Sequence, residues 1–338
     1  MDFHAVPHAE RFRRLLQTRG VLVADGATGT NLFRAGLESG SSPELLNIDN
    51  PEGVMANHEA MIMAGADIIL TNSFGGTANR LKLHGAADRV RELNREAARL
   101  ARAVADRSER SILVAGSMGP TGDIMQPVGD LAHDDAVRAF REQALGLASG
   151  GADVIWIETM SSIEETEAAI EGAAPAGLPL VCTMTFDTNG RTMMGVTPEH
   201  AADHFATAPL AGFGANCGNG FGELVAAIAA MNTSQTCRHP LVAKANCGIP
   251  EYVDGRIRYS GTPEIMGVYA RLARDAGASI IGGCCGSAPE HITAIRESLQ
   301  DYSPGPAPEL ADIEAILGLS RAAPAHGRKR VRRSRRHR

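Results

Sequence analysis

Residues 64–74 read AGADIILTNSF, and this stretch contains the repeating unit from which the fold can be predicted. A helical pattern ends at Ala64, a glycine follows, and a short apolar run leads into a polar tip. Glycine suits the left-handed conformation found after many helices. The phrase returns as GGADVI at 150–155 and as AGASII at 276–281. We interpret the three copies as ordinary helix-to-strand loops rather than as a duplication.

The same alternation of apolar runs and helical patterns continues along the chain. We expect eight strands, at Val21–Ala24, Ala66–Thr71, Ile112–Gly116, Val154–Ile157, Leu180–Phe186, Gly212–Asn216, Leu241–Ala245 and Ser279–Gly282. Apolar residues at helical spacing predict helices at Pro51–Ala64, Arg89–Ala105, His133–Gly150, Ile163–Gly172, Pro198–Ala206, Phe221–Met231 and Pro263–Ala276. Apolar strands alternating with helices are typical of a covered parallel sheet. Eight such units predict an α/β fold, a (β/α)8 TIM barrel.

The segments that flank this barrel differ from it in composition. We expect residues 1–19 to be a helical extension, with a helix at Ala9–Arg19, and the barrel to occupy 20–300. The phrase SPGPAPEL marks a Pro-rich linker over 301–319, which ends in a short helix at Ala311–Leu317. The basic residues of 320–338 predict a disordered tail.

Charge, hydropathy and cysteine content limit the class of protein. The net charge is −6, but Arg328–Arg338 carries eight Lys or Arg residues, so the rest of the chain is eight units more negative than the whole. The chain has no apolar run long enough to cross a bilayer and no pattern of a secretory signal at its N-terminus. We therefore expect a cytoplasmic protein without a membrane partner. Six cysteines in 338 residues are too few for a disulfide scaffold.

Three of the cysteines fall at the ends of the predicted sixth and eighth strands, where barrels carry their active sites. Cys217 ends the sixth strand in GANC, and Cys284 and Cys285 end the eighth in GGCCG. Three thiolates with a fourth position open match a catalytic zinc site, and soft thiolate ligands suit alkyl transfer to sulfur. The alternative is a set of packing residues, because cysteine is often buried. We interpret the remaining cysteines as a core residue, an incidental loop residue and a residue of open role: Cys182, Cys237 and Cys247.

Two carboxylates also lie at predicted strand ends. Asp25 follows the first strand, and Glu158 ends the fourth in WIET. Together they could bind the ammonium group of an amino acid, and the alternative for each is a helix cap or a salt bridge. The loop GATGT after Asp25 offers backbone N–H groups to a carboxylate.

The phrases DGATGT, AGADIILTNSF, GSMGPTG, WIET, GANC and GGCCG, in this order, resemble the homocysteine methyltransferase barrel from about residue 20 to residue 298. The resemblance implies that Cys217, Cys284 and Cys285 bind Zn²⁺. It also implies that Asp25 and Glu158 hold the amino group of homocysteine, while the loop backbone holds its carboxylate. Further substrate-binding residues follow from the same motifs: Gly26, Ala27, Thr28 and Asn216.

Within this family the chain resembles bacterial betaine–homocysteine methyltransferases, through TNSFGGTANRLKLHG, FDTNGRTMMGVT and GIPEYVDG. This implies methyl transfer from betaine to homocysteine, giving methionine and dimethylglycine. Animal betaine enzymes hold the quaternary ammonium in an aromatic cage, and two of the cage positions are Gly75 and Thr159 here. The candidate donor-site residues are Phe74, Phe186 and Tyr252, with Phe33 and Tyr259 as further aromatics.

Other donors and other classes of protein stay open. S-methylmethionine, dimethylsulfoniopropionate or a methyl-folate could supply the methyl group to homocysteine. A thiol- or zinc-binding module without turnover is the alternative of another class. The basic tail could contact nucleic acid phosphates, but one such tail on an acidic body favours a role in solubility. The sequence leaves the oligomeric state open.

Overall fold

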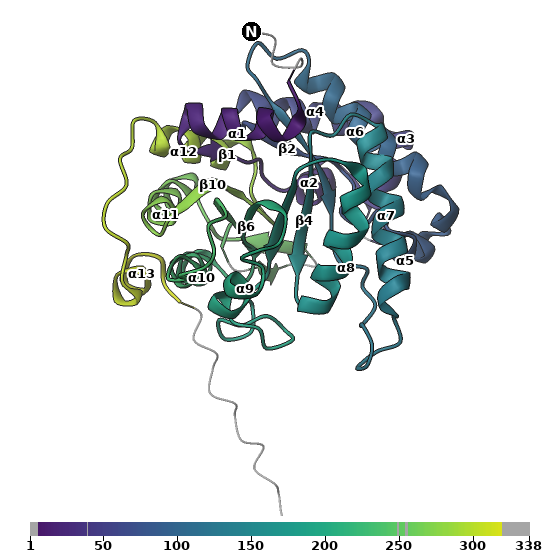
Figure 1. Cartoon of the computed structure of the whole chain (residues 1–338). Helices are drawn as coiled ribbons and strands as arrows, with labels where there is room; N and C mark the ends of the chain where they lie inside the picture. The colour runs from purple at the N-terminus through teal and green to yellow at the C-terminus, as the bar shows by residue number, and fades with distance from the viewer. Residues whose placement is uncertain (1–5, 39, 249, 254–255, 320–338) are drawn as a thin grey trace, which may run out of the picture.

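The strands form a single barrel in the computed structural model, which describes all residues except 1–5, 39, 249, 254–255 and 320–338, and describes 250–253 and 256–258 by backbone alone. Eight parallel strands make one sheet in the order β1-β10-β7-β6-β5-β4-β3-β2. A parallel bridge between Ala24 and Ile68 brings the two edges of this sheet together. Helices surround the strands (Figure 1). The predicted (β/α)8 fold is therefore confirmed.

The eight predicted strands are all present, with small shifts at their ends. They are β1 Leu22–Val23, β2 Ile68–Leu70, β3 Leu113–Met118, β4 Val154–Met160, β5 Leu180–Met184, β6 Leu210–Cys217, β7 Leu241–Ala245 and β10 Ala278–Gly283. The glycines before β2, β4 and β10 have φ values of 108°, 97° and 107°, as the repeated phrase predicts. At these positions a residue with a side chain would be strained.

The expected helices are present as α1 His8–Arg19, α4 Pro51–Met63, α6 Val90–Ala105, α7 His133–Ser149, α8 Ile163–Ala173, α9 Pro198–His204, α10 Phe221–Asn232, α11 Pro263–Asp275 and α13 Leu310–Leu317. Helix α12, Pro289–Leu299, completes the eighth unit and was not among the expected helices. Other unpredicted elements are short: α2 Thr28–Arg34, η2 Pro43–Leu45, α3 Leu46–Asp49, α5 Ala78–Leu81, η3 Lys82–His84, η4 Ala87–Arg89, η5 Ala174–Ala176, and the hairpin of β8 Pro250–Val253 with β9 Arg256–Tyr259. Such short elements carry too little periodicity to be recognised in sequence.

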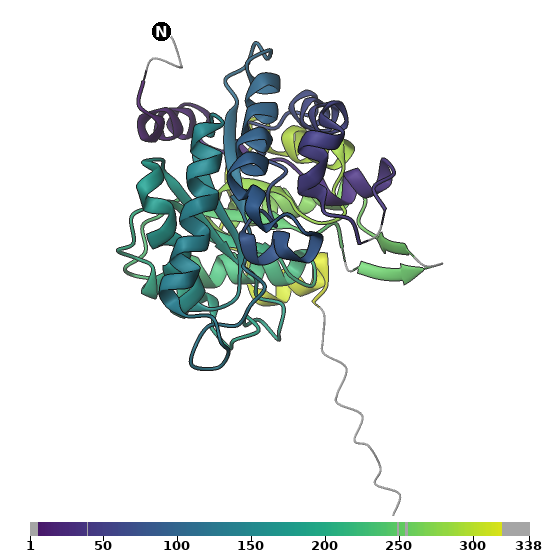
Figure 2. The same ribbon diagram turned by 90° about the vertical axis from the view of Figure 1, so that its right-hand side faces the viewer.

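Helix α1 closes one end of the barrel. Its side chains Phe12 and Leu15 join the apolar cluster that fills the barrel interior, together with Trp156. Figure 2 shows α1 on one side of the molecule and the β8–β9 hairpin extending from the other. The site is therefore expected at the end of the barrel opposite α1. The predicted limits of the barrel at 20–300 stay a prediction, and the basic tail over 320–338 lies outside the described residues.

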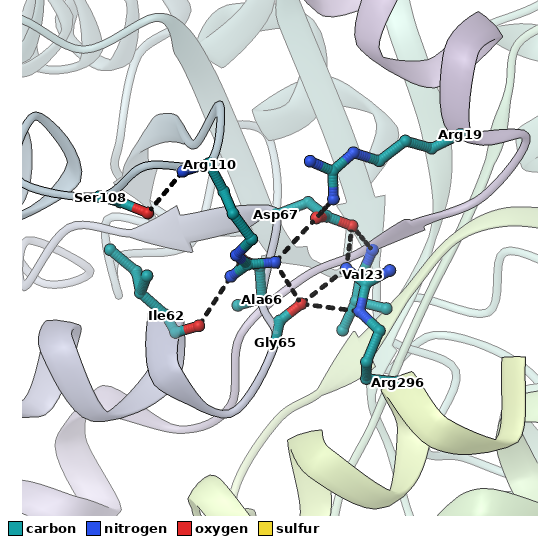
Figure 3. Close-up of polar contacts among 9 residues, drawn as sticks. All are labelled: Arg19, Val23, Ile62, Gly65, Ala66, Asp67, Ser108, Arg110 and Arg296. Atoms are coloured by element: carbon teal, nitrogen blue, oxygen red, sulfur yellow. Dashed lines mark hydrogen bonds and ion pairs between the residues drawn. The ribbon is translucent and has the colours of Figure 1, made fainter. Parts of the chain in front are cut away.

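The repeated phrases also supply two buried aspartates at the end of the barrel that α1 covers. Asp67 forms ion pairs with Arg19 of α1, with Arg110 and with Arg296 of α12, and it accepts a hydrogen bond from the backbone N–H of Val23 at 3.0 Å (Figure 3). Asp153 in the second copy likewise pairs with two arginines, Arg11 and Arg102. Each carboxylate thus joins strands to the helices around them.

The approach of β6 to β7 depends on a glycine. A Cβ atom on Gly214 would lie 2.0 Å from the carbonyl oxygen of Val242, whereas one on Gly212 would meet nothing closer than 3.4 Å. We expect Gly214→Ala to lower the free energy of unfolding by about 2 to 3 kcal/mol, because the strands must separate. Gly212→Ala in the same strand is the matched control and should cost less than about 1 kcal/mol. Chemical denaturation checks both, and equal effects would contradict this reading.

Candidate active site

A cavity of about 450 Å³ opens at the carboxyl ends of the strands. This volume lies within the range of small-molecule sites. Its lining combines the loop after β1, at Gly26, Ala27 and Thr28, with residues at the ends of β2, β3, β4, β6, β7 and β10, and it contains three of the six cysteines. Polar and charged side chains therefore converge where the barrel architecture predicts an active site.

The three predicted ligand cysteines lie together in this cavity. The Sγ atoms of Cys217, Cys284 and Cys285 are all within 4.8 Å of one another. Strand β7 lies between β6 and β10 in the sheet. The cysteines at the carboxyl ends of β6 and β10 therefore approach each other across the end of β7. Sulfur atoms around a tetrahedral zinc ion are about 3.8 Å apart, given Zn–S bonds of about 2.3 Å. The spacing and the softness of this ligand set fit a zinc ion.

Cys247, at the tip of β7, does not belong to the cluster. Its thiol lies 3.2 Å from the carbonyl oxygen of Gly261 and donates to it, and burial raises its pKa to about 11. Cys182 is buried within β5, as predicted. Among the described residues, the thiols that lie close enough together to share a metal ion are therefore those of Cys217, Cys284 and Cys285.

Backbone and amide groups hold the cysteine cluster in place. Asn246 accepts a hydrogen bond from the backbone N–H of Cys285 at 3.0 Å and donates to the carbonyl of Gly218 at 2.7 Å. Cys217 has a φ of 64°, which is rare for a residue with a side chain. Strained backbone of this kind persists where surrounding contacts fix it, often at functional sites.

The thiols also share their protons unequally. Hydrogen bonds from Cys284 and Cys285 lower the pKa of Cys217. The hydrogen bond between Cys217 and Cys284 in turn raises the pKa of Cys284. The cluster therefore favours one thiolate supported by two thiols, and a bound cation would favour deprotonation of all three.

The two predicted carboxylates have different surroundings. Asp25 is fully buried, and its oxygens accept hydrogen bonds from Lys244 Nζ at 3.2 Å and from the backbone N–H of Leu70 at 2.7 Å. Glu158 lines the cavity and accepts a hydrogen bond from Ser117 Oγ. Burial raises the pKa of Glu158 to about 7. Glu158 thus faces a ligand directly, while Asp25 lies behind Lys244.

Lys244 is a site residue that the sequence analysis missed. It is 2% exposed inside the barrel, lines the cavity floor, and lies 5.4 Å from the centre of the Trp156 ring. Burial alone would lower its pKa, but the negative charges of Asp25, Glu158 and Cys284 raise it. A lysine within the apolar run LVAKA was the available signal, because lysine is almost never buried without a partner.

Asn216 braces the wall of the site from a fully buried position. Its Oδ1 accepts hydrogen bonds from the backbone N–H of Thr159 at 2.8 Å and from Thr183 Oγ1 at 2.7 Å. Its Nδ2 donates to Thr159 Oγ1 at 2.7 Å and lies 3.7 Å from Cys284 Sγ. The amide therefore joins the tips of β4, β5 and β6 to the cysteine cluster.

The candidate donor-site aromatics are only partly brought together. Phe74 is 36% exposed and lines the cavity, as does Phe33. Phe186 instead packs in the core outside the barrel, because the chain turns away after β5 and buries the ring. Tyr259 lies beside the thiol of Cys285. The side chain of Tyr252 lies outside the described residues.

A sequence profile described as "Homocysteine S-methyltransferase" matches residues 22–299 of the chain. The chain belongs to the homocysteine S-methyltransferase family. The match extends from β1 to the end of α12, so it includes the cavity, the cysteine cluster and both carboxylates. The resemblance found in the sequence is therefore confirmed for the family as a whole.

Relatives in this family include much longer proteins. The chain is 32% identical to the methionine synthase of Mycobacterium tuberculosis (strain ATCC 25618 / H37Rv) over 299 residues, which is 82% of this chain and 24% of that protein. It is 31% identical to the methionine synthase of Mycobacterium leprae (strain TN) over 316 residues, 87% of this chain and 26% of that protein. The chain thus spans about a quarter of the length of these curated relatives.

A solved homocysteine S-methyltransferase shares the fold. The metallated form of the homocysteine methyltransferase MmuM from Escherichia coli has a TM-score of 0.71 and 23% identity, covering 85% of this chain and 99% of that one. At this identity the likeness supports the barrel architecture alone. Within the described residues, no helix is both long and apolar enough to cross a membrane.

Proposed function

We propose that this protein transfers a methyl group from betaine to the sulfur of homocysteine, with Zn²⁺ held by Cys217, Cys284 and Cys285. The observation that carries the proposal is the cluster of three thiols opening into the cavity of a family barrel. The metallated structure of the Escherichia coli neighbour supports a metal in such a barrel. When held by these three thiolates, zinc would favour the deprotonated form of a substrate thiol at neutral pH.

The residues around the cluster suit an amino acid with a thiol side chain. Glu158 faces the cavity and accepts hydrogen bonds from the substrate ammonium. Asp25 contributes indirectly, because it accepts a hydrogen bond at 3.2 Å from the ammonium group of Lys244, which lines the cavity. The N–H groups in the first turn of α2, at Thr28 and beyond, have no partners within the helix and can receive the carboxylate. The substrate sulfur then lies toward the cysteines.

The transfer is a single displacement. The homocysteine sulfur forms a bond to a methyl carbon of betaine while the bond from that carbon to nitrogen breaks. The electron pair of the broken bond stays on nitrogen, so dimethylglycine leaves with a neutral amine and the other product is methionine. The cavity contributes by holding both molecules in line and by excluding water, which replaces a bimolecular encounter by an oriented one.

A panel of donors tests the proposal. Zinc-loaded protein is mixed with homocysteine and, separately, with betaine, S-methylmethionine, dimethylsulfoniopropionate or a methyl-folate, and methionine is measured by mass spectrometry. We expect methionine and dimethylglycine from betaine. Methionine from another donor alone would overturn betaine but keep the acceptor. Zinc binding without methionine from any donor would leave a thiol-binding module.

The pH dependence of homocysteine use should report on Glu158. Its raised pKa of about 7 means that the ionised form, which binds ammonium, predominates only above that pH. We expect kcat/KM for homocysteine to be about tenfold lower at pH 6 than at pH 8 or above. Glu158→Gln should lower kcat/KM at pH 8 and remove this dependence. A thiol substrate without an amino group is the control for titration of sulfur. If kcat/KM for that thiol falls in the same way below pH 7, the fall cannot be assigned to the binding of ammonium by Glu158.

A further inference from the structure

Gly75 lies in the loop after β2, and a carboxylate occupies the space that a side chain at this position would need. A Cβ atom built on Gly75 would lie 2.9 Å from Glu44 Oε1. Glu44 belongs to η2, a segment far from β2 in sequence, and it lines the cavity. An aromatic side chain at residue 75 would therefore have to displace Glu44.

The carboxylate of Glu44 is held in place by two hydrogen bonds. It accepts a hydrogen bond from the backbone N–H of Gly75 at 2.6 Å and one from Ser42 Oγ at 2.6 Å. Glu44 is 6% exposed, and in the described part of the chain no lysine, arginine or histidine forms an ion pair with it. A buried carboxylate without a counter-charge is costly, so a cationic ligand beside it would be stabilised.

Phe74 adds an aromatic surface next to this carboxylate. Its ring packs over Gly119, where a Cβ atom would lie 2.5 Å from the ring. The ring is fixed on that side, yet 36% of the residue stays exposed at the cavity. Aromatic faces attract cations such as quaternary ammonium groups. Phe74 and Glu44 therefore offer two kinds of attraction to one cation.

A free positive charge lies elsewhere along the same cavity. Arg80 of α5 lines it, and no ion pair or side-chain hydrogen bond joins its guanidinium to another described residue. Its neighbour Lys82, by contrast, pairs with Asp123 at 3.3 Å. Guanidinium groups match carboxylates by paired hydrogen bonds. Arg80 is therefore suited to the anionic end of a ligand.

We propose that this part of the cavity is a subsite for a zwitterionic methyl donor, in which Glu44 and Phe74 hold the onium group and Arg80 holds a carboxylate. The proposal rests on the methyl transfer proposed above and names the residues that select its donor. Betaine and dimethylsulfoniopropionate have both charges on a short chain. A trimethylammonium group has no N–H, so charge and aromatic contact are what can hold it.

Two neutralised analogues of betaine test each charge separately. In 3,3-dimethylbutanoate, carbon replaces the quaternary nitrogen, so that the shape is kept and the cation is lost. In betaine amide the carboxylate is replaced and the cation is kept. Binding is measured by calorimetry to the zinc-loaded full chain, with and without methionine, which occupies the acceptor side and accepts no methyl group. We expect betaine to bind about 10- to 100-fold more tightly than either analogue.

Variants then assign each preference to its residue. Glu44→Gln should remove the preference for betaine over 3,3-dimethylbutanoate and leave the preference for betaine over betaine amide. Arg80→Gln should remove the preference for betaine over betaine amide and leave the preference over 3,3-dimethylbutanoate. Glu165→Gln is the matched control for Glu44, because Glu165 is also buried and accepts a backbone N–H and a hydroxyl, both from Thr121. Lys82→Gln is the control for Arg80. Neither control should change the two ratios.

The comparison of betaine with its two analogues uses wild-type protein, so it does not depend on whether any variant folds. If either analogue binds wild-type protein as tightly as betaine, the subsite is overturned even when betaine is a good donor. Unchanged ratios in well-folded Glu44→Gln and Arg80→Gln would overturn the residue assignment in the same way. Failure of the proposed function looks different, because then betaine yields no methionine from homocysteine.

Discussion

Cys284→Ala should abolish metal binding and methyl transfer together. The change leaves two sulfur ligands where zinc sites of this class need three from the protein, and it removes the hydrogen bond that lowers the pKa of Cys217. A metal that activates the substrate thiol contributes several kcal/mol to the rate, so we expect at least about a 1000-fold loss of kcat/KM. Zinc per chain is measured by elemental mass spectrometry, alongside methionine formation.

Cys247→Ala is the matched control for this substitution. Cys247 lies at the tip of β7, between the two strands that carry the cluster, but its thiol donates to the carbonyl of Gly261. We expect full zinc content and activity within a few-fold of wild type. A Cys284→Ala protein that stays active without metal would end the zinc account. Loss of zinc in both variants would mean that the ligand set is wrong.

Asp67→Ala should cause the largest loss of stability. The side chain is fully buried and pairs with Arg19, Arg110 and Arg296, which come from three separate parts of the chain. Removing it leaves three guanidinium groups without their shared anion and the N–H of Val23 without its acceptor. We expect a loss of about 3 to 5 kcal/mol in the free energy of unfolding, as for other broken buried ion pairs, measured by urea denaturation.

Asp135→Ala removes a surface ion pair with Arg138 and provides the comparison. Exposed pairs contribute at most about 1 kcal/mol, so this variant should unfold near the wild-type midpoint. Because Asp67 lies at the end of the barrel away from the cysteines, the folded fraction of Asp67→Ala should bind zinc normally. A wild-type midpoint for Asp67→Ala would show that the arginines find other partners.

The barrel could be predicted because short, local sequence patterns define its strands and its helix-to-strand turns. Each strand is a short apolar run, and each of Gly65, Gly151 and Gly277 has the positive φ that its place after a helix predicts. The cysteine cluster followed from the same reasoning, since strand ends of a parallel barrel share one face. Cys217 and Cys284 are far apart in sequence, but their places on β6 and β10 bring them together.

The rest of the site depends on contacts that no local pattern encodes. Glu44 comes from a three-residue helix, and its position beside Gly75 follows only from the folded loops. Lys244 is an unusual residue within an apolar strand, but its partner Asp25 is far away in sequence and is identified only in the folded barrel. The structure buries Phe186 in the core instead of in the cavity lining, because a residue just past a strand end can turn toward the core as well as toward the cavity.

Zinc K-edge X-ray absorption on the loaded protein tests the central claim most directly. It counts the sulfur atoms bound to the metal, first without and then with homocysteine. We predict three sulfur neighbours from the cysteine cluster, rising to four when homocysteine is added and unchanged when methionine is added instead. A count that stays the same with homocysteine, or that falls below three in the protein alone, would contradict the account.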